Sequence, residues 1–281
     1  MHTPVLLNEV VEALDVHPGG VYIDGTLGEG GHTMAIAERG GKVLAIDWDD
    51  SQVKSQKSKV KNFDVTFTQG NYAEILRIAN ENGFKEVDGI VFDFGLSMRQ
   101  LSESKRGFSY KNPDEPLDMR IGDDQMPTAA DIINTFTEEQ LYDVFARYSE
   151  ELHSRELSEY IVRARTIKNF ETVGDLLKVI DAVISDCQAS HGHKADAIYA
   201  QIFQALRVCV NSEYDNIRAG LSGALSLLKL NGNLAVITFH SGEDRIVKQF
   251  ARENSLKMTV VKGSWEKKFE RSAILRVIGK K

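Results

Sequence analysis

The sequence has almost no cysteine, and this shortage excludes two classes of protein. Only Cys187 and Cys209 occur among its 281 residues, and neither belongs to a Cys-x-x-Cys pair. Such usage provides neither the disulfide framework of a small secreted domain nor the paired ligands of a zinc finger. The stretch 190–193, Ser-His-Gly-His, has two histidines but no partners at ligand spacing, so it is predicted to be a loop. We expect both cysteines to pack against neighbouring helices, and we expect no metal site.

Long apolar runs are absent as well. No stretch approaches the roughly 18 apolar residues of a membrane-spanning helix. Residues 1–4 lack both the basic start and the apolar core of a signal peptide. The composition, 42% hydrophobic and 27% charged, is that of an ordinary globular protein. We expect a cytoplasmic protein without a membrane segment.

A net positive charge is also missing. The net charge of −7 argues against indiscriminate binding of nucleic acid. The charge is unevenly spread, because residues 245–281 carry eleven Lys or Arg against three Asp or Glu. This end of the chain either forms a basic face or consists of solvated helix and strand edges.

Glycine, in contrast, is concentrated after the first predicted strand. Residues 21–23 are apolar or aromatic, Asp24 follows, and glycines stand at 28, 30 and 31 before a helix-like sequence that starts at Met34. A strand, a Gly-rich turn and a helix are typical of a site for a nucleotide-like ligand, because bare backbone can approach the ligand closely.

This glycine loop suits S-adenosyl-L-methionine (AdoMet) better than other nucleotides. A dinucleotide fingerprint starting at Gly28 would need glycine where Thr33 stands. A phosphate loop would need a lysine, whereas this loop carries Glu29. AdoMet has a sulfonium and an amino group and no phosphate. The second predicted strand ends in Asp47, whose carboxylate could accept both ribose hydroxyls.

Hydrophobic patterning predicts an α/β fold with seven strands. Apolar runs mark strands at 21–24, 43–47, 65–68, 87–93, 234–239, 258–261 and 273–278. Helical spacing between the first four indicates a parallel sheet. Seven strands ending in a terminal pair are the layout of the class I, Rossmann-like AdoMet-dependent methyltransferases.

The chain between the fourth and fifth strands is too long for a simple crossover. Leu234 lies 141 residues after Asp93 (234 minus 93), whereas a parallel crossover needs only about a dozen residues. Four helical patterns occupy it, at 129–136, 138–148, 154–165 and 173–185. We expect a methyltransferase domain formed by residues 1–108 and 195–281, with residues 109–194 as an inserted all-helical domain.

The chemistry should lie beyond the carboxyl ends of the strands, where open α/β sheets bind ligands. Besides the glycine loop and Asp47, the segments 93–97 and 240–245 converge there. Tyr72, after the third strand, either stacks on an adenine or packs as a core aromatic. Methylation of an exocyclic base amine needs an acceptor that orients its N–H bonds, a role for Asp93 or Asp244, and the base must leave its stack.

Several motifs together carry a resemblance that covers nearly the whole chain. They are residues 2–9, 24–32, 106–110, 116–120, 203–207, 239–241 and 243–248. In these segments the sequence resembles the MraW family, the small-subunit ribosomal RNA methyltransferases H. The resemblance implies AdoMet-dependent methylation of cytidine N4 in 16S rRNA of the small ribosomal subunit. It also implies RNA recognition by the helical insert, a cytoplasmic enzyme and a capacity to form a homodimer.

The candidate residues follow from the resemblance and from the chemistry. By the resemblance, AdoMet would be bound by Gly30, Gly31, His32, Asp47, Tyr72 (usually phenylalanine in the family), Asp93 and Gln100. At the transfer site we predict Asp93, His240 and Asp244. Contacts to phosphate or base are predicted for Arg106, Arg120 and Arg245, each with an ion pair inside the protein as the alternative.

The sequence departs from the family's pattern mainly on the substrate side. Residues 197–201 read Ala-Ile-Tyr-Ala-Gln where the family has His-Pro-Ala-Thr-Arg, and Gly242 replaces the usual leucine. Phe94, Leu96, Met98 and Ser102 also differ, and the segment 263–270 is short. Three alternatives stay open: a methyltransferase acting on another RNA, an AdoMet-binding assembly protein with little turnover, and a nicotinamide dehydrogenase, which Thr33 disfavours.

Overall fold

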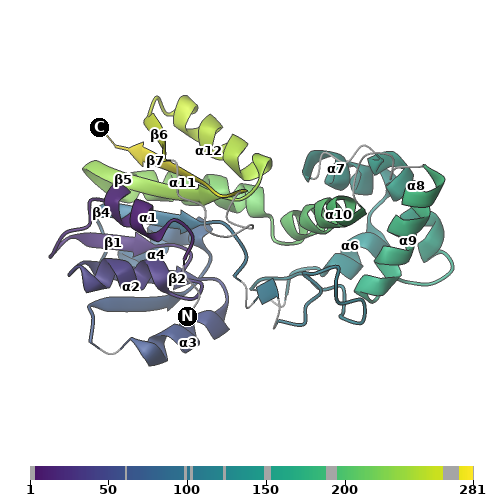
Figure 1. Cartoon of the computed structure of the whole chain (residues 1–281), viewed down its shortest axis with the longest axis horizontal. Helices are drawn as coiled ribbons and strands as arrows, with labels where there is room; N and C mark the ends of the chain where they lie inside the picture. The colour runs from purple at the N-terminus through teal and green to yellow at the C-terminus, as the bar shows by residue number, and fades with distance from the viewer. Residues whose placement is uncertain are drawn as a thin grey trace. The chain divides into compact units, whose positions relative to one another are not determined.

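The chain divides into two compact units, which Figure 1 shows in a computed structural model. The structure describes residues 4–60, 62–97, 100–101, 104–122, 125–148, 153–187, 195–261 and 272–280. We call Met1–Ser97 with Tyr214–Lys281 the sheet unit, and Met98–Glu213 the helical unit. The predicted 190–193 loop, Met98, Ser102, the 263–270 segment and the start of the 2–9 motif lie outside the described residues.

The sheet unit is built on one seven-stranded sheet with the order β3-β2-β1-β4-β5-β7-β6. The strands are β1 Val21–Asp24, β2 Lys42–Asp47, β3 Val65–Gln69, β4 Val87–Asp93, β5 Leu228–Thr238, β6 Lys257–Val261 and β7 Ile274–Gly279. The first five strands pair in parallel, and β7 is antiparallel to both β5 and β6. This arrangement confirms the predicted class I methyltransferase fold.

The central strands are buried on both faces. Residues 43–46 of β2 and 90–92 of β4 have no exposed surface. Unbroken apolar runs of this kind are typical of parallel strands covered by helices on both sides. The helices of this unit are α1 Leu7–Ala13, α2 Gly31–Glu38, α3 Asp50–Lys59, the 3-10 helix η1 Tyr72–Glu74, α4 Ile75–Glu81, α11 Glu213–Leu227 and α12 Ser241–Glu253.

The helical unit contains α6 Ala129–Thr135, α7 Glu138–Tyr148, α8 Ser154–Arg165, α9 Val173–Asp186 and α10 Ala195–Val210. Side-chain caps fix where three of them begin, and before α6 the cap is a reciprocal box of Thr128 and Asp131. Thr172 and Asp175 form a reciprocal capping box before α9, and Thr137 and Gln140 exchange equivalent hydrogen bonds before α7. In the described part of the chain, no helix is long and apolar enough to cross a membrane.

The helical unit is longer than the predicted insert of residues 109–194. Its early segment is tied in by two hydrogen bonds: the Met119 amide donates to the Arg106 carbonyl at 2.8 Å, and the Gly107 amide donates to Glu115 at 3.0 Å. Its last helix, α10, packs against α6, α7 and α9. Both segments therefore belong to the helical unit instead of to the methyltransferase domain.

Two boundaries in the sheet unit also differ from the prediction. The predicted fifth strand ends at residue 239, whereas β5 ends at Thr238, and the segment 240–245 is the cap and first turn of α12, because His240 and Glu243 form a capping box. β5 begins at Leu228 and not at the predicted Leu234, and its pairing with β4 is irregular between residues 228 and 233.

Candidate active site

Asp24, the last residue of β1, fixes both ends of the glycine loop. Its side chain is fully buried, and Oδ1 accepts a hydrogen bond from the Thr26 amide at 3.1 Å. Its Oδ2 accepts from both the amide and the hydroxyl of Thr33, at 3.1 and 2.7 Å. Burial raises the pKa of Asp24. This role of Asp24 is not among those predicted from the sequence. Its sequence signal is a pair of threonines, Thr26 and Thr33, two and nine positions after an acid that ends a strand.

The glycine loop presents bare backbone at the start of α2. Gly28 (φ +48°) and Gly30 (φ +80°) have the left-handed conformation that favours glycine, and Gly30 is the N-cap of α2. A Cβ on Gly31 would lie 1.8 Å from Cγ of Pro4, so only glycine fits there. The predicted AdoMet contacts Gly30 and Gly31 thus lie at a helix N-terminus, whose free N–H groups favour polar ligands.

Asp47 lies beside this loop at the end of β2. Its Oδ2 accepts a hydrogen bond from the Gly28 amide at 2.7 Å, and its Oδ1 accepts one from the Asp49 amide at 2.9 Å. Burial raises the pKa of Asp47 to about 7, although both backbone hydrogen bonds oppose the shift. Each carboxylate oxygen has a second lone pair, so Asp47 can accept further hydroxyl groups.

His32 and Asp93 place buried polar atoms without partners near the loop. Nε2 of His32 lies 3.8 Å from Oδ2 of Asp93, too far for a hydrogen bond. Among the described residues, neither ring nitrogen of His32 nor Oδ1 of Asp93 has a hydrogen-bond partner, although all three atoms are buried. The Asp93 amide donates to Thr26 Oγ1 at 2.6 Å, which ties the end of β4 to the loop.

Tyr72 packs in an aromatic cluster. Its ring centroid lies 5.6 Å from that of Phe92 and 5.4 Å from that of Phe94, and these two phenylalanines stack on each other. A Cβ on Gly220 of α11 would lie 2.8 Å from Tyr72 Cδ2, so the ring also contacts that helix. The core role foreseen for Tyr72 is therefore present, and its contact with AdoMet stays a prediction.

Gln52 of α3 is a buried polar residue that the sequence does not reveal as part of the site, because its helix reads as exposed and lysine-rich. Its side chain is 1% exposed, and Nε2 donates to Ser97 Oγ at 2.8 Å. Its Oε1 is buried with no partner among the residues that the structure describes. Gln52 thus links α3 to the segment that follows Asp93.

His240 is the N-cap of α12. Its Nδ1 accepts from the Glu243 amide at 3.4 Å, and its Nε2 lies 2.9 Å from Glu243 Oε1 without the alignment of a hydrogen bond. Glu243 is 1% exposed and accepts the Phe239 amide at 2.7 Å. The ring of Tyr214 packs against that of His240, with 6.0 Å between centroids. His240 thus sets the direction of the chain after β5.

Asp244 is held in an ion pair. Arg276 of β7 donates to its two oxygens at 2.5 and 3.0 Å, and Lys248 lies 3.1 Å from Oδ2. Burial raises the pKa of Asp244, but the hydrogen bonds and charges of these partners outweigh burial and leave the pKa below its usual range. Both oxygens are therefore used within the protein. Its neighbour Arg245 is exposed on α12.

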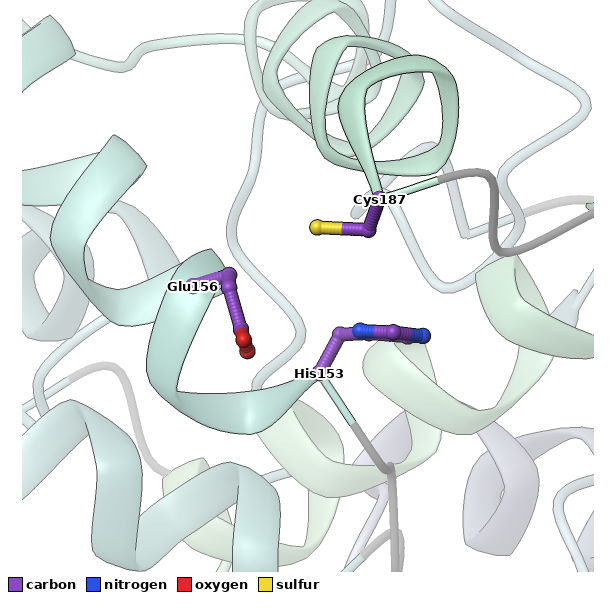
Figure 2. A group of neighbouring side chains, drawn as sticks. All are labelled: His153, Glu156 and Cys187. Carbon is purple, nitrogen blue, oxygen red and sulfur yellow. The ribbon is translucent and has the colours of Figure 1, made fainter.

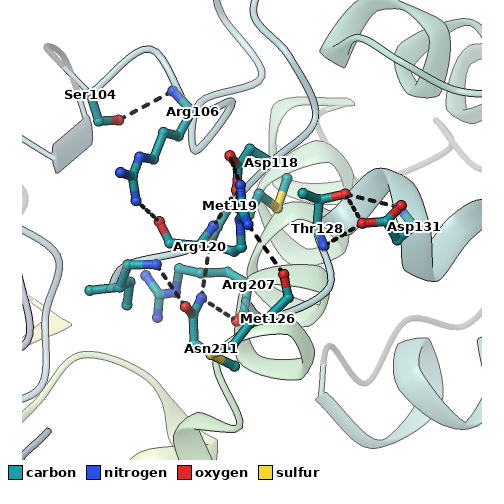
Figure 3. Close-up of polar contacts among 11 residues, drawn as sticks. Ser104, Arg106, Asp118, Met119, Arg120, Met126, Thr128, Asp131, Arg207 and Asn211 are labelled. Carbon is teal, nitrogen blue, oxygen red and sulfur yellow. Dashed lines mark hydrogen bonds and ion pairs between the residues drawn. The ribbon is translucent and has the colours of Figure 1, made fainter. Parts of the chain in front are cut away.

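The other predicted site residues lie in the helical unit. Arg120 binds Asp118 through two hydrogen bonds of 2.7 and 2.9 Å, and Arg106 donates to the Arg120 carbonyl at 2.9 Å (Figure 3). The structure thus shows the ion pair foreseen as the alternative for Arg120. Gln100 is half-buried, and its carbonyl accepts from the Ser104 hydroxyl at 2.6 Å.

Comparison with known proteins decides the family. The whole chain, residues 1–281, matches the model of the MraW methylase family. The chain belongs to this family. Ribosomal RNA small subunit methyltransferase H of Symbiobacterium thermophilum is 42% identical over 258 residues, which are 89% of this chain and 80% of the relative. The protein of the same name from Dictyoglomus thermophilum is 40% identical, with 99% of this chain and 96% of the relative covered.

The structure gives physical reasons for two departures from the MraW pattern. A Cβ on Gly242 would lie 1.8 Å from the hydroxyl of Tyr214, so the usual leucine cannot fit beside this tyrosine. In the departing segment 197–201, Tyr199 donates a hydrogen bond to Asp181, and its ring packs 5.4 Å from that of Tyr110. The hydrogen bond to Asp181 raises the pKa of Tyr199 to about 12. Tyr199 therefore joins α10 to α9.

Proposed function

We propose that this chain transfers a methyl group from AdoMet to N4 of cytosine 1402 in 16S rRNA. Membership of a methylase family supports methyl transfer, and the names of the relatives support small-subunit ribosomal RNA as the substrate. The observation that carries the proposal is the set of buried polar atoms on His32 and Asp93 that have no partner among the described residues.

These atoms fit a polar ligand. A buried polar atom without a hydrogen bond costs about 1–3 kcal/mol, so the fold retains His32 and Asp93 there at a cost in stability. A ligand with several donors and acceptors would satisfy them. The neighbouring loop adds backbone that a Cβ would obstruct, since Gly31 has no room for one. Both features suit AdoMet, which carries an amino group, a carboxylate, a ribose and an adenine.

Each proposed AdoMet contact has a chemical role. Asp47 accepts the ribose hydroxyls, and the backbone at Gly30 and Gly31 and the ring of His32 contact the polar end of the ligand. Tyr72 covers the adenine, and the contact with Gln100 that the resemblance implies stays a prediction. AdoMet, when bound, supplies a methyl group made electrophilic by its sulfonium. The protein then has to hold the amine in line with that methyl group.

Asp93 is the better candidate for orienting the cytosine amine. Its Oδ1 has no partner in the described part of the chain, so it can accept an N–H bond and leave the nitrogen lone pair directed at the methyl group. The oxygens of Asp244 are already bound by Arg276 and Lys248. We therefore assign Asp244 to holding α12 on β7, with His240 as the cap that positions the same helix.

The helical unit is proposed to recognise the RNA. Its residues 106–110 and 116–120 carry two of the motifs that match the family, and Arg106 and Arg120 lie within them. Arg245, exposed on α12, lies in the basic segment 245–281 and is proposed to contact phosphate. The homodimer and the cytoplasmic location implied by the resemblance stay predictions.

The test is mass spectrometry of nucleosides from 16S rRNA. The purified protein and labelled AdoMet are incubated with small ribosomal subunits from a strain that lacks such a methylase. We expect N4-methylcytidine at one position, and we expect Asp93→Ala to remove it. Asp88→Asn is a matched control, because Asp88 lies at the other end of β4 and pairs with Lys229.

Other outcomes would separate the alternatives. AdoMet binding with no label in these subunits would overturn the proposed substrate, and label in another RNA would then identify a divergent methyltransferase. AdoMet binding without transfer to any RNA would favour an assembly protein. Binding of a nicotinamide dinucleotide in place of AdoMet would point to a dehydrogenase.

A further inference from the structure

Three side chains of the helical unit form a cluster whose chemistry the proposed function does not use. His153 is the N-cap of α8, Glu156 lies in the first turn of that helix, and Cys187 is the C-cap of α9. One nitrogen, one carboxylate oxygen and the sulfur of these residues all lie within 4.8 Å of one another. Figure 2 shows the three side chains at the ends of two helices, with the His153 ring extending away from Glu156.

The packing of α8 on α9 explains why these residues meet. The helices are joined by a short connection, so the start of α8 lies beside the end of α9. Their buried contact includes Leu157 and Val183, which are 1% and 4% exposed. The Tyr160 hydroxyl donates to Asp186 at 2.6 Å, which fixes the register one turn further along α8. His153 and Glu156, three residues apart, share one face of the helix.

We propose that His153, Glu156 and Cys187 bind a zinc ion. Imidazole nitrogen, thiolate sulfur and carboxylate oxygen are the three ligand types that zinc accepts, and three protein ligands leave a fourth, tetrahedral position for water. Ligand atoms bound to one zinc lie closer together than 4.8 Å, so the three side chains have to rotate toward one another to bind it. The thiol proton of Cys187 passes to the solvent when its sulfur binds the metal.

The surroundings favour a cation that, like zinc, accepts nitrogen, sulfur and oxygen ligands together. Glu156 and Asp186 place acidic groups at the cluster, and all three ligand residues are half-buried, so an ion can enter. His153 also lines a small apolar cavity with Leu157 and Ile198. A soft sulfur ligand disfavours magnesium and calcium, which prefer oxygen alone. Zinc bound there would connect α8 to α9 and stabilise the helical unit.

The experiment measures metal binding to the full chain. The protein is purified under a thiol-free reductant, stripped of metal and titrated with Co²⁺ as a spectroscopic substitute, then with Zn²⁺ against a chromophoric chelator. We expect one equivalent of Co²⁺ to give a thiolate-to-cobalt charge-transfer band that Zn²⁺ displaces. Zinc should also raise the melting temperature of the protein.

Variants identify the ligands. Cys187→Ser should abolish the charge-transfer band. His153→Gln and Glu156→Gln should each weaken zinc binding by at least roughly tenfold, because changing even a residue that only supports a metal ligand typically costs about that much. Cys209→Ser is the matched control, since it makes the same chemical change at the other cysteine, on α10. The double variant His191→Ala/His193→Ala controls for binding by the histidines at 190–193. Circular dichroism checks that each variant keeps its helices.

Results with the wild-type protein and with the variants could each overturn the proposal. One is the absence of a charge-transfer band in the wild-type protein at saturating Co²⁺. Another is a band that persists in Cys187→Ser, or that disappears in Cys209→Ser. Loss of zinc binding in the His191/His193 variant, with the three proposed ligands intact, would assign the metal to the histidine pair instead.

Discussion

Asp24 and Asp47 show how burial of a carboxyl group shapes the glycine loop at the scale of single residues. Both accept hydrogen bonds from backbone N–H groups of the loop or its flanks, and burial raises the pKa of both. A folded-state pKa above the unfolded value of about 3.9 means that the folded protein holds a proton more tightly. Both carboxyl groups therefore destabilise the fold as the pH rises above the unfolded pKa, and for Asp47 this loss grows until the pH reaches its folded-state pKa of about 7.

AdoMet affinity should depend on pH through Asp47. Its pKa is about 7, and the ionised form accepts ribose hydroxyls best. We expect the association constant to rise by up to roughly tenfold between pH 6 and 8, as the ionised fraction grows. Isothermal titration calorimetry across this range checks the prediction.

Asp47→Asn is the control, because the ligand's own ionisation is the same in both titrations. The variant should bind more weakly, and the ratio of the wild-type to the variant association constant should grow with pH. A ratio that stays constant across the range would show that Asp47 does not titrate in the site.

Gly242→Leu should destabilise the protein. The new Cβ would meet the Tyr214 hydroxyl at 1.8 Å, so the ring would have to leave His240 or the first turn of α12 would have to shift. Overpacking of this kind costs about 1–3 kcal/mol, measurable by urea unfolding. Adding Tyr214→Ala should recover part of the loss, whereas Ser241→Ala, at an exposed neighbour, should change little. Equal stability of Gly242→Leu and the wild type would contradict the close packing.

At the scale of elements, the ends of helices and strands decide the geometry of the candidate site. Strands β1, β2 and β4 each end in an aspartate, and α2 and α12 begin at the glycine loop and at His240. Each end leaves backbone N–H or C=O groups that need partners. The candidate residues therefore serve both as helix and strand terminators and as groups available to a ligand.

The strand ends that form the candidate site follow from the sequence, whereas the start of α12 and the long-range contacts do not. Apolar runs that end in acids locate β1, β2 and β4 to within one residue, because burial on both faces requires such runs. The sequence does not indicate where α12 starts, because histidine is an uncommon N-cap and the His240–Glu243 pair departs from the usual Ser or Thr capping box. Contacts such as Gln52 with Ser97 join distant segments, so no local pattern predicts them.

Asp244→Asn should lower the free energy of unfolding strongly and should change the rate of methyl transfer per folded molecule much less. The change leaves the buried guanidinium of Arg276 without its charged partner, which costs about 3–5 kcal/mol. Because the pKa of Asp244 is lowered in the folded state, its contribution is present above the unfolded pKa and is lost as the pH falls through the folded one. Urea unfolding at neutral pH tests the loss.

Lys248→Met provides the comparison for this ion pair. Lys248 is half exposed, so removing it should cost less than about 1 kcal/mol. Full stability of Asp244→Asn, combined with loss of methyl transfer per folded molecule, would return Asp244 to the transfer site.

At the scale of the whole molecule, the two units should respond to different ligands. AdoMet is proposed to bind mainly the sheet unit, and zinc the helical unit. A ligand stabilises the unit that binds it by mass action. We expect calorimetry to resolve two unfolding transitions, with AdoMet raising mainly one melting temperature and Zn²⁺ the other. The Cys187→Ser variant should keep the AdoMet shift and lose the zinc shift. A single transition shifted by both ligands would show that the units unfold together.

The insertion of the helical unit between β4 and β5 has a consequence for the synthesis of the chain. β4 leaves the ribosome long before its partner β5, so the nascent half-sheet has an open apolar edge along residues 87–92. The helical unit is continuous in sequence and can fold during this interval, because its contacts are local. The time needed to translate the chain from β4 to β5, most of it through residues 98–213, therefore limits how long the edge of β4 is available for aggregation or for capture by a chaperone.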